Sequence, residues 1–267
     1  MRSSITSLPP RLIHAFTGPN CAGNPAWVVP VQPTADIHAT AAQYLARPGA
    51  TACALLLPAT HRNSSITLRS FGPSGEIQLC GHALLCAAHW LWSHGKQEPL
   101  HFDLPACQQR IRATRLHDET CLTLPSNNYR LCSPPEGLAT LIGQRILRCA
   151  RSTALPGSLI VELHSESAVR EVQLNATALI QLTTDCVLTT ARSHRPGIDV
   201  VSRYFTPAYG ALEDPATGSA HCLIANWWRG RLGSRPLRCW QASPQGGWLQ
   251  AQHMGSSTRI WGKCSTL

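Results

Sequence analysis

Lysine is almost missing from this chain of 267 residues, in which Lys96 and Lys263 are the only examples. The formal net charge of +9 therefore rests on arginine. The arginines are dispersed, with no basic run and no alternation of basic and aromatic residues that would mark a nucleic-acid groove. We interpret them as mostly solvated side chains and expect no nucleic-acid partner. One or two arginines could still hold an anionic small molecule, because a guanidinium pairs with a carboxylate through two hydrogen bonds.

Long apolar runs are missing as well. No stretch approaches the roughly 18 apolar residues of a membrane-spanning helix, and residues 1–12 hold no apolar core of a secretory signal. We therefore expect a cytoplasmic protein with no membrane partner. The composition, 43% hydrophobic and 14% charged, is typical of a globular chain.

Cysteine is frequent, but the spacings that give it a metal or redox role are missing. None of the 12 cysteines forms a Cys-x-x-Cys pair, and most stand among apolar residues, so we expect buried free thiols. His82, Cys86 and His89 are spaced like metal ligands on one helix. That helix is apolar on nearly all faces, which favours packing over ligation, and we expect no metal and no other cofactor.

An internal repeat organises the chain. The tetrapeptide at residues 70–73 (SFGP) returns at residues 204–207 (YFTP), 134 positions later. The segment GHALLCAAHW at residues 81–90 returns as GSAHCLIANW at residues 218–227, 137 positions later. Both offsets are about half the chain length. The repeat predicts two pseudo-equivalent halves, which we place at residues 1–126 and 127–267.

Each repeat ends in a predicted helix. Residues 82–94 and 219–229 are rich in alanine and leucine, and the glycines Gly95 and Gly230 are expected to end them. Both segments are apolar on nearly all faces, which indicates burial. Two further helices are predicted over residues 34–46 and 134–143. Alternating apolar residues predict strands, giving an α+β architecture of mostly antiparallel sheet; the clearest strands are 66–69, 121–124, 159–163 and 200–204.

The starts of the two buried helices are the candidate reaction centre. A helix N-terminus presents free backbone N–H groups and a partial positive charge, so two of them facing one cleft would hold a carboxylate. The anchor would be the backbone at Gly81, Gly218 and Ser219 together with the Ser219 hydroxyl. Beside it stand side chains suited to proton transfer, namely Cys80, His82, Asp214 and His221. Close helix packing without chemistry is the alternative, and the repetition of the arrangement favours a functional site.

Five sequence blocks occur in order from about residue 12 to residue 262. They are HAFT at 14–17 with GNPA at 23–26, FGP at 71–73 with Glu76, LCGHA at 79–83, RYFTP at 203–207 with EDPATGSA at 213–220, and SPQGG at 243–247. Together they resemble the phenazine-biosynthesis PhzF-like family, a branch of the diaminopimelate-epimerase fold. The resemblance implies two pseudo-symmetric domains, each a curled sheet around a central helix, with the site between them. It also implies a homodimer, and it adds Asn24, Ala50 and Thr51 to the residues expected to bind substrate.

One position departs from the family pattern. The family carries a proton-shuttling glutamate in a Ser-Glu-Thr segment, and Ala50 stands at that place here. Alanine transfers no proton, so Cys80, His82 and Asp214 become the candidate catalytic residues. Cys80 directly precedes a helix, where a thiol pKa can be lowered, and the more distantly similar diaminopimelate epimerases carry an acid/base cysteine at a similar place.

These observations predict a cofactor-independent isomerase or epimerase that moves a proton on a small carboxylate or amino-acid-like metabolite. Two alternatives remain open. One is a ligand-binding protein that has lost catalysis with its glutamate, and the other is a lyase or C–C hydrolase on the same scaffold.

Overall fold

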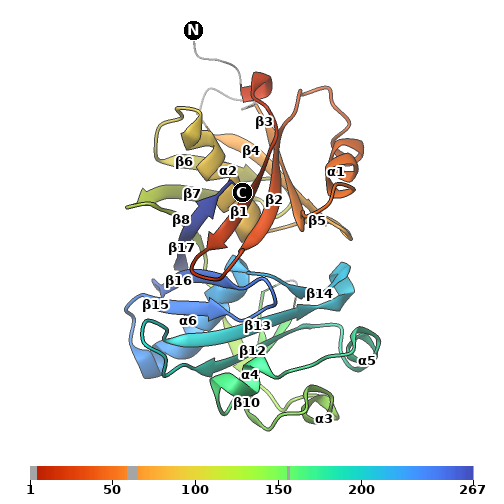
Figure 1. The fold of residues 1–267 in the computed structure, drawn as a ribbon, viewed down its shortest axis with the longest axis vertical. Helices are drawn as coiled ribbons and strands as arrows, with labels where there is room; N and C mark the ends of the chain where they lie inside the picture. Colours follow the sequence, from red (N-terminus) through yellow and green to blue (C-terminus); the bar gives the residue numbers. More distant parts are fainter. Residues whose placement is uncertain (1–4, 59–64, 155–156, 267) are drawn as a thin grey trace.

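The computed structural model describes residues 5–58, 65–154 and 157–266 of the chain. The fold is α+β, as predicted, with two halves stacked along the long axis of the molecule (Figure 1). The first half contains η1 (Ile5–Ser7), β1 (Arg11–Thr17), β2 (Asn24–Pro30), α1 (Ile37–Leu45), β3 (Ala52–Leu57), β4 (Ile66–Gly72), β5 (Gly75–Ile77), α2 (Gly81–Ser93), β6 (Leu100–Leu104), β7 (Gln109–Leu116) and β8 (Glu119–Pro125).

The second half repeats the order of strands and central helix, with additional elements at its start and two short helices in the place of α1. It contains β9 (Tyr129–Leu131), α3 (Leu138–Ile142), β10 (Ile146–Ser152), β11 (Ser158–Leu163), α4 (Glu166–Arg170), α5 (Ala176–Leu182), β12 (Cys186–Arg192), β13 (Val200–Thr206), η2 (Pro207–Tyr209), β14 (Ala211–Asp214), α6 (Gly218–Leu232), β15 (Leu237–Gln241), β16 (Gly247–His253) and β17 (Ser257–Ser265). The four strands predicted most clearly lie within β4, β8, β11 and β13.

The strand pairing repeats as well. In the first half β2 and β3 are parallel, as are β4 and β6; in the second half the parallel pairs are β11 with β12 and β13 with β15. The antiparallel pairs β3–β4 and β12–β13 also correspond. This equivalence of pairings is the structural counterpart of the sequence repeat.

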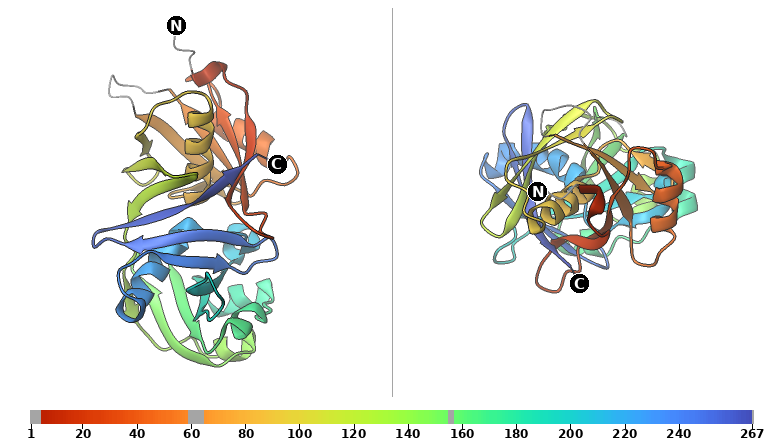
Figure 2. Two further views of the ribbon diagram at one scale, coloured as in Figure 1. Left: turned by 60° about the vertical axis from the view of Figure 1, so that its left-hand side comes forward. Right: turned by 90° about the horizontal axis from the view of Figure 1, so that it is seen from above.

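The sheet of the first half closes into a ring around α2. The ring runs β1, β2, β3, β4, β6, β7, β8 and back to β1 through β17, because β17 pairs with both β8 and β1. Strand β17 also pairs with β16 of the second half and so lies across both halves, as the left view of Figure 2 shows. The boundary at residues 126 and 127 stays a prediction, and the last strand is shared across it.

The two central helices are buried, as their composition predicts. Every residue of α2 is buried except His89 and Ser93. Helix α6 shows the same pattern over residues 218–228, apart from the partly exposed Ser219. A helix that packs against strands on all sides must be apolar on all sides, and this explains the absence of a polar face.

The prediction that Gly230 ends the second helix is wrong. Helix α6 continues to Leu232, and its cap is Gly233, whose φ of 80° is readily adopted only by glycine. Gly230 is exposed and is tolerated inside the helix at a cost of about 1 kcal/mol relative to alanine. The helices predicted over 34–46 and 134–143 are present as the shorter α1 and α3.

Within the described part of the chain, no helix is both long and apolar enough to cross a membrane.

Candidate active site

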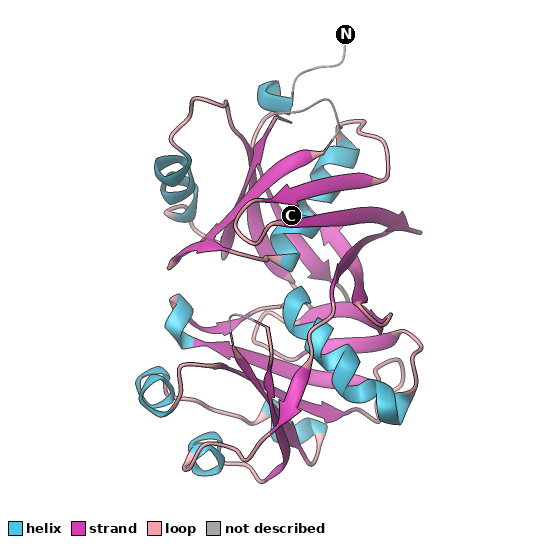
Figure 3. Cartoon of the chain, turned by 180° about the vertical axis from the view of Figure 1, so that it is seen from behind, coloured by secondary structure: helices cyan, strands magenta, loops and turns pink. Residues whose placement is uncertain are grey.

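The two buried helices meet at their N-termini. A Cβ atom placed on Gly81 would lie 3.2 Å from Gly218 Cα and 3.4 Å from the backbone nitrogen of Ser219. A Cβ on Gly218 would in turn lie 3.5 Å from Gly81 Cα. A side chain at Gly81 would force the facing backbone to shift by a few tenths of an ångström, so glycine favours this close approach. The approach brings the free N–H groups of both first turns to one place, as the sequence repeat predicts (Figure 3).

Phe16 supports this junction from the first half. It is fully buried with a φ of 64°, at an irregularity in the pairing of β1 with β17. A Cβ on Gly218 would lie 3.2 Å from the Phe16 ring, and one on Gly262 would lie 2.8 Å from it. The bulge therefore turns the ring beneath the start of α6.

Asn24 connects the two halves beside the junction. Its side-chain nitrogen donates hydrogen bonds of 2.8 Å to Asp214 Oδ1 and to the backbone oxygen of Ala216. Its side-chain oxygen accepts a hydrogen bond from the Thr51 hydroxyl. Asn24 is fully buried, so these partners occupy its amide. It positions Asp214 rather than presenting a free group to a ligand.

Thr51 extends this chain of hydrogen bonds to His82. The Thr51 hydroxyl faces Asn24 Oδ1 and, at 2.8 Å, the backbone oxygen of Pro25, both of which only accept. Thr51 Oγ1 therefore accepts from His82 Nε2, 3.2 Å away, and Nε2 carries the imidazole hydrogen. His82 Nδ1 is left as an acceptor and faces Cys80 Sγ at 3.4 Å. The network fixes both the tautomer of His82 and the direction of the Cys80 thiol hydrogen.

Burial keeps both members of this Cys–His pair uncharged. The pKa of Cys80 is raised to about 12, mainly by desolvation and to a lesser extent by the negative charge of Asp214, although a hydrogen bond from the backbone nitrogen of Ala83 acts in the lowering direction. Desolvation also lowers the pKa of His82, against an opposing effect of Asp214. The expectation that the helix N-terminus lowers the thiol pKa is therefore not met, because loss of solvent outweighs the helix end. Cys80 is a protonated thiol at neutral pH, suited to giving a proton.

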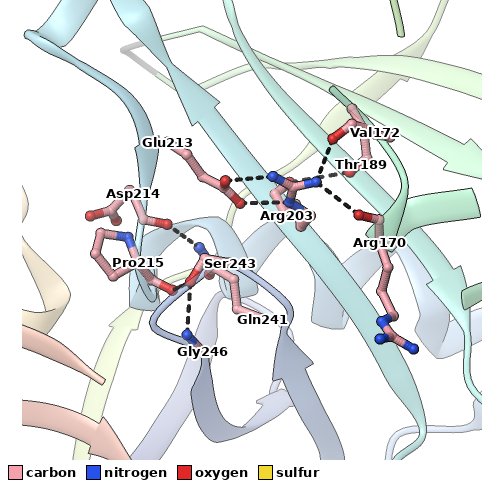
Figure 4. Close-up of polar contacts among 10 residues, drawn as sticks. All are labelled: Arg170, Val172, Thr189, Arg203, Glu213, Asp214, Pro215, Gln241, Ser243 and Gly246. Carbon is pink, nitrogen blue, oxygen red and sulfur yellow. Dashed lines mark hydrogen bonds and ion pairs between the residues drawn. The ribbon is translucent and has the colours of Figure 1, made fainter. Parts of the chain in front are cut away.

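Asp214 is held from the second half (Figure 4). Gln241 donates a 2.6 Å hydrogen bond to its backbone oxygen and accepts one of 2.8 Å from the backbone nitrogen of Thr217. The Thr217 hydroxyl donates to Asp214 Oδ2. On the other side, Ser243 donates to the backbone oxygen of Pro215 at 2.6 Å. The carboxylate is thus fixed in orientation while Asp214 stays partly exposed.

Two symmetric ion pairs flank the site, and both escaped the sequence analysis. Arg203 on β13 forms two parallel hydrogen bonds of 2.8 and 2.7 Å with Glu213, the residue before Asp214 (Figure 4). Arg69 on β4 pairs in the same way with Glu76. The two arginines are 134 positions apart and the two glutamates 137 apart, so the repeat offsets were the signal that could have found them.

The remaining predicted residues are placed as follows. Ala50 and Ser219 are partly exposed; Ala50 directly precedes Thr51, and Ser219 is the second residue of α6. His221 lies outside the site: it is fully buried, its Nδ1 donates to the backbone oxygen of Thr217 at 2.7 Å, and its Nε2 is 3.3 Å from Ser202 Oγ. Its role is to hold the first turn of α6.

No group of three or more histidine, cysteine or acidic side chains that could hold a metal ion occurs among the described residues.

Comparison with known proteins agrees with this architecture. The sequence model of a family described as phenazine biosynthesis-like protein matches residues 13–264. An uncharacterized isomerase of Halalkalibacterium halodurans is 30% identical over 267 residues, covering 98% of this chain and 97% of that protein.

Solved structures give the same result. A phenazine biosynthesis protein of the PhzF family from Enterococcus faecalis superposes with a TM-score of 0.84 at 26% identity, covering 96% of this chain and 95% of its own. A hydroxyproline epimerase from Agrobacterium vitis, crystallised with bound trans-4-hydroxy-L-proline, has a TM-score of 0.62 at 16% identity, covering 97% of this chain and 88% of its own. The latter likeness concerns the fold alone.

Proposed function

The chain belongs to the phenazine biosynthesis-like protein family, and we propose that it is an isomerase or epimerase acting on a small carboxylate-bearing metabolite. The observation that carries the proposal is the unbroken hydrogen-bonded series Cys80, His82, Thr51, Asn24 and Asp214 beside the meeting point of two helix N-termini. Potential proton donors and acceptors and an anion-binding backbone occur together there. The relative from Halalkalibacterium halodurans that is named as an isomerase supports this class of reaction.

The substrate carboxylate would bind the N–H groups at Gly81, Gly218 and Ser219. These groups belong to the first turns of α2 and α6 and lack partners within their helices. The partial positive charge of each helix end favours an anion. Ser219 is partly exposed and offers its hydroxyl as a further donor. A carboxylate fixed there also stabilises negative charge that develops on the neighbouring carbon.

Proton transfer would use the two sides of this anchor. Asp214, as a carboxylate, takes the proton from the carbon next to the substrate carboxylate, and the bonding electron pair stays on the substrate. Cys80 delivers the proton of its thiol to the substrate when the S–H rotates from His82 Nδ1 toward the substrate carbon, and the sulfur is left as a thiolate. Both groups then return to their starting protonation by exchange with water. Asn24 and Thr51 connect the base, Asp214, to the His82 and Cys80 side of the site and so fix their relative positions.

Ala50 favours one alternative, a binding protein without turnover. It stands directly before Thr51, partly exposed, and its methyl group carries no proton. If Asp214 and Cys80 do not replace the missing carboxyl group, the cleft binds its ligand without reaction. The expected homodimer and cytoplasmic location are independent of this choice and stay predictions.

The test is deuterium incorporation. Small amino and carboxylic acids are incubated with the protein in D2O and analysed by mass spectrometry. We expect uptake with the unmodified protein, loss with Asp214→Asn, and a strong reduction with Cys80→Ala. Cys239→Ala is the matched control, because it removes another buried thiol whose pKa is likewise raised by burial but which lies on β15, outside the site.

Each other outcome has a defined meaning. Uptake that begins only with Ala50→Glu would indicate a binding protein whose catalysis has been lost. Cleavage of a ligand would indicate a lyase or C–C hydrolase. Unchanged uptake with both Asp214→Asn and Cys80→Ala would contradict the proposed roles.

A further inference from the structure

A hollow of about 450 Å³ lies at the far end of α6, away from the candidate active site. It opens between the last turns of α6 and the strands β9 and β10, and its lining residues are Tyr129, Arg148, Asn226, Trp227, Arg229, Gly230, Arg231 and Ser234. Gly230 stands opposite open space, since a Cβ on it would meet no atom within 4 Å. The lining contains three arginines and no acidic residue.

The positive charge of this hollow is largely unpaired. Arg231 is neutralised by Glu162, which accepts from both of its terminal nitrogens at 2.5 and 2.8 Å. Within the described residues, neither Arg148 nor Arg229 forms an ion pair with any acid. Burial lowers the pKa of the nearby His253, and the positive charge of Arg229 acts in the same direction. Arg148 and Arg229 therefore line the hollow without an ion-pair partner among the described residues.

The walls of the hollow are held in place before any ligand arrives. The Arg148 guanidinium lies 4.6 Å from the centre of the Trp227 ring, which fixes it by a cation–π contact. Trp227 donates a hydrogen bond of 2.9 Å to Glu162 and contacts Tyr129 edge to face. Asn226 donates to the backbone oxygen of Asn127 at 3.0 Å. Arg148, Trp227 and Asn226 therefore lose little side-chain freedom on binding, and this favours affinity.

We propose that this hollow is a second ligand site, which binds a small anion carrying two or more negative charges on phosphate or carboxylate groups. Guanidinium groups bind such groups through paired, charge-assisted hydrogen bonds. The volume admits a molecule larger than a single phosphate ion. From Gly218 to Arg229 the axis of α6 spans about 16 Å at 1.5 Å per residue, so the site is distinct from the candidate active site.

The proposal is tested by isothermal titration calorimetry at low ionic strength, with inorganic pyrophosphate and citrate as probes. Pyrophosphate binding that citrate does not match indicates a phosphate ligand, and the reverse indicates a polycarboxylate. The double variant Arg148→Gln/Arg229→Gln removes both unpaired charges while keeping side-chain length. We expect its dissociation constant for the bound probe to rise about tenfold or more, as expected for losing hydrogen bonds to charged groups.

Arg192→Gln is the matched control. Arg192 is exposed at the end of β12 and forms no ion pair among the described residues, so its substitution removes one positive charge away from the hollow, where the double variant removes two at the hollow. Its dissociation constant should stay within twofold of the unmodified protein. The proposal is overturned if neither probe binds, or if the double variant binds as tightly as the control, since any remaining binding would then belong to the helix N-termini.

Discussion

Replacing Asn24 with alanine tests whether the two halves are joined through one buried amide. The substitution removes the donor of the hydrogen bonds to Asp214 Oδ1 and to the backbone oxygen of Ala216. It also removes the acceptor of the Thr51 hydroxyl. Ala216 is buried, so its carbonyl would be left without a hydrogen-bond partner. The variant therefore loses the hydrogen bonds themselves and also bears the free-energy cost of an unpaired buried polar group.

The expected loss of stability follows from these contacts. A hydrogen bond to a charged group contributes about 1.5–3 kcal/mol, and one between neutral groups about 1 kcal/mol. Water reaches the partly exposed Asp214 and offsets part of the loss. We expect the free energy of unfolding to fall by about 3 kcal/mol, which corresponds to a decrease in Tm of roughly 6–12 °C for a chain of this size. Deuterium exchange into substrate should fall about a hundredfold, because Asp214 loses its fixed orientation.

Urea unfolding followed by circular dichroism gives the stability, and mass spectrometry in D2O gives the exchange. The matched control is Asn175→Ala, which removes the N-cap of α5 and should cost about 1 kcal/mol without changing exchange. A free energy of unfolding for Asn24→Ala within about 0.5 kcal/mol of the unmodified protein would refute the reasoning, because removing a buried amide with all of these hydrogen bonds should cost more than that.

Three further predictions concern the burial of His221, the glycines of the two central helices, and the ion pair of Arg203. The pKa of His221 is lowered by burial from 6.5 to about 4. Between these two pH values the unfolded chain binds a proton at His221 and the folded protein does not. The contribution of His221 to the free energy of unfolding should therefore be complete above pH 6.5 and should fall by about 3 kcal/mol toward pH 4. Urea unfolding at several pH values should show a smaller fall for His221→Gln, and equal slopes would contradict this. Gly81→Ala should disrupt the helix junction and abolish exchange, whereas Gly230→Ala should raise Tm because its Cβ meets open space. Arg203→Lys should cost about 1–2 kcal/mol in urea unfolding, because lysine cannot form both bonds to Glu213; an unchanged midpoint would count against that pairing.

Much of the architecture could be predicted from the sequence because two signals are local and repeated. The apolar segments after Gly81 and Gly218 predict buried helices from composition alone, and their common offset predicts that they are equivalent. The end of α6 could not be predicted, because Gly230 and Gly233 are both glycines and only their backbone conformations tell them apart. The sharing of β17 between the halves also has no sequence signal, since it depends on which distant strand offers a free edge.

The proximity of the candidate site residues was predictable from the sequence, but the hydrogen bonds between them were not. The repeat places Cys80, His82 and Asp214 near the helix starts, and the structure brings them together. The sequence gives no indication that the Thr51 hydroxyl donates a hydrogen bond to Asn24, because hydrogen-bond partners depend on side-chain orientation. Nor could it give the thiol pKa, which depends on burial as well as on the helix end.

The position of β17 constrains the order in which the protein can form during synthesis. The ring of the first half lacks a strand until residues 257–265 have left the ribosome, long after β1 and β8. Until then the facing edges of β1 and β8 are unpaired and open to association with other chains. The first half therefore cannot complete its folding before residues 257–265 have left the ribosome, and their emergence sets the earliest time at which the candidate active site can form.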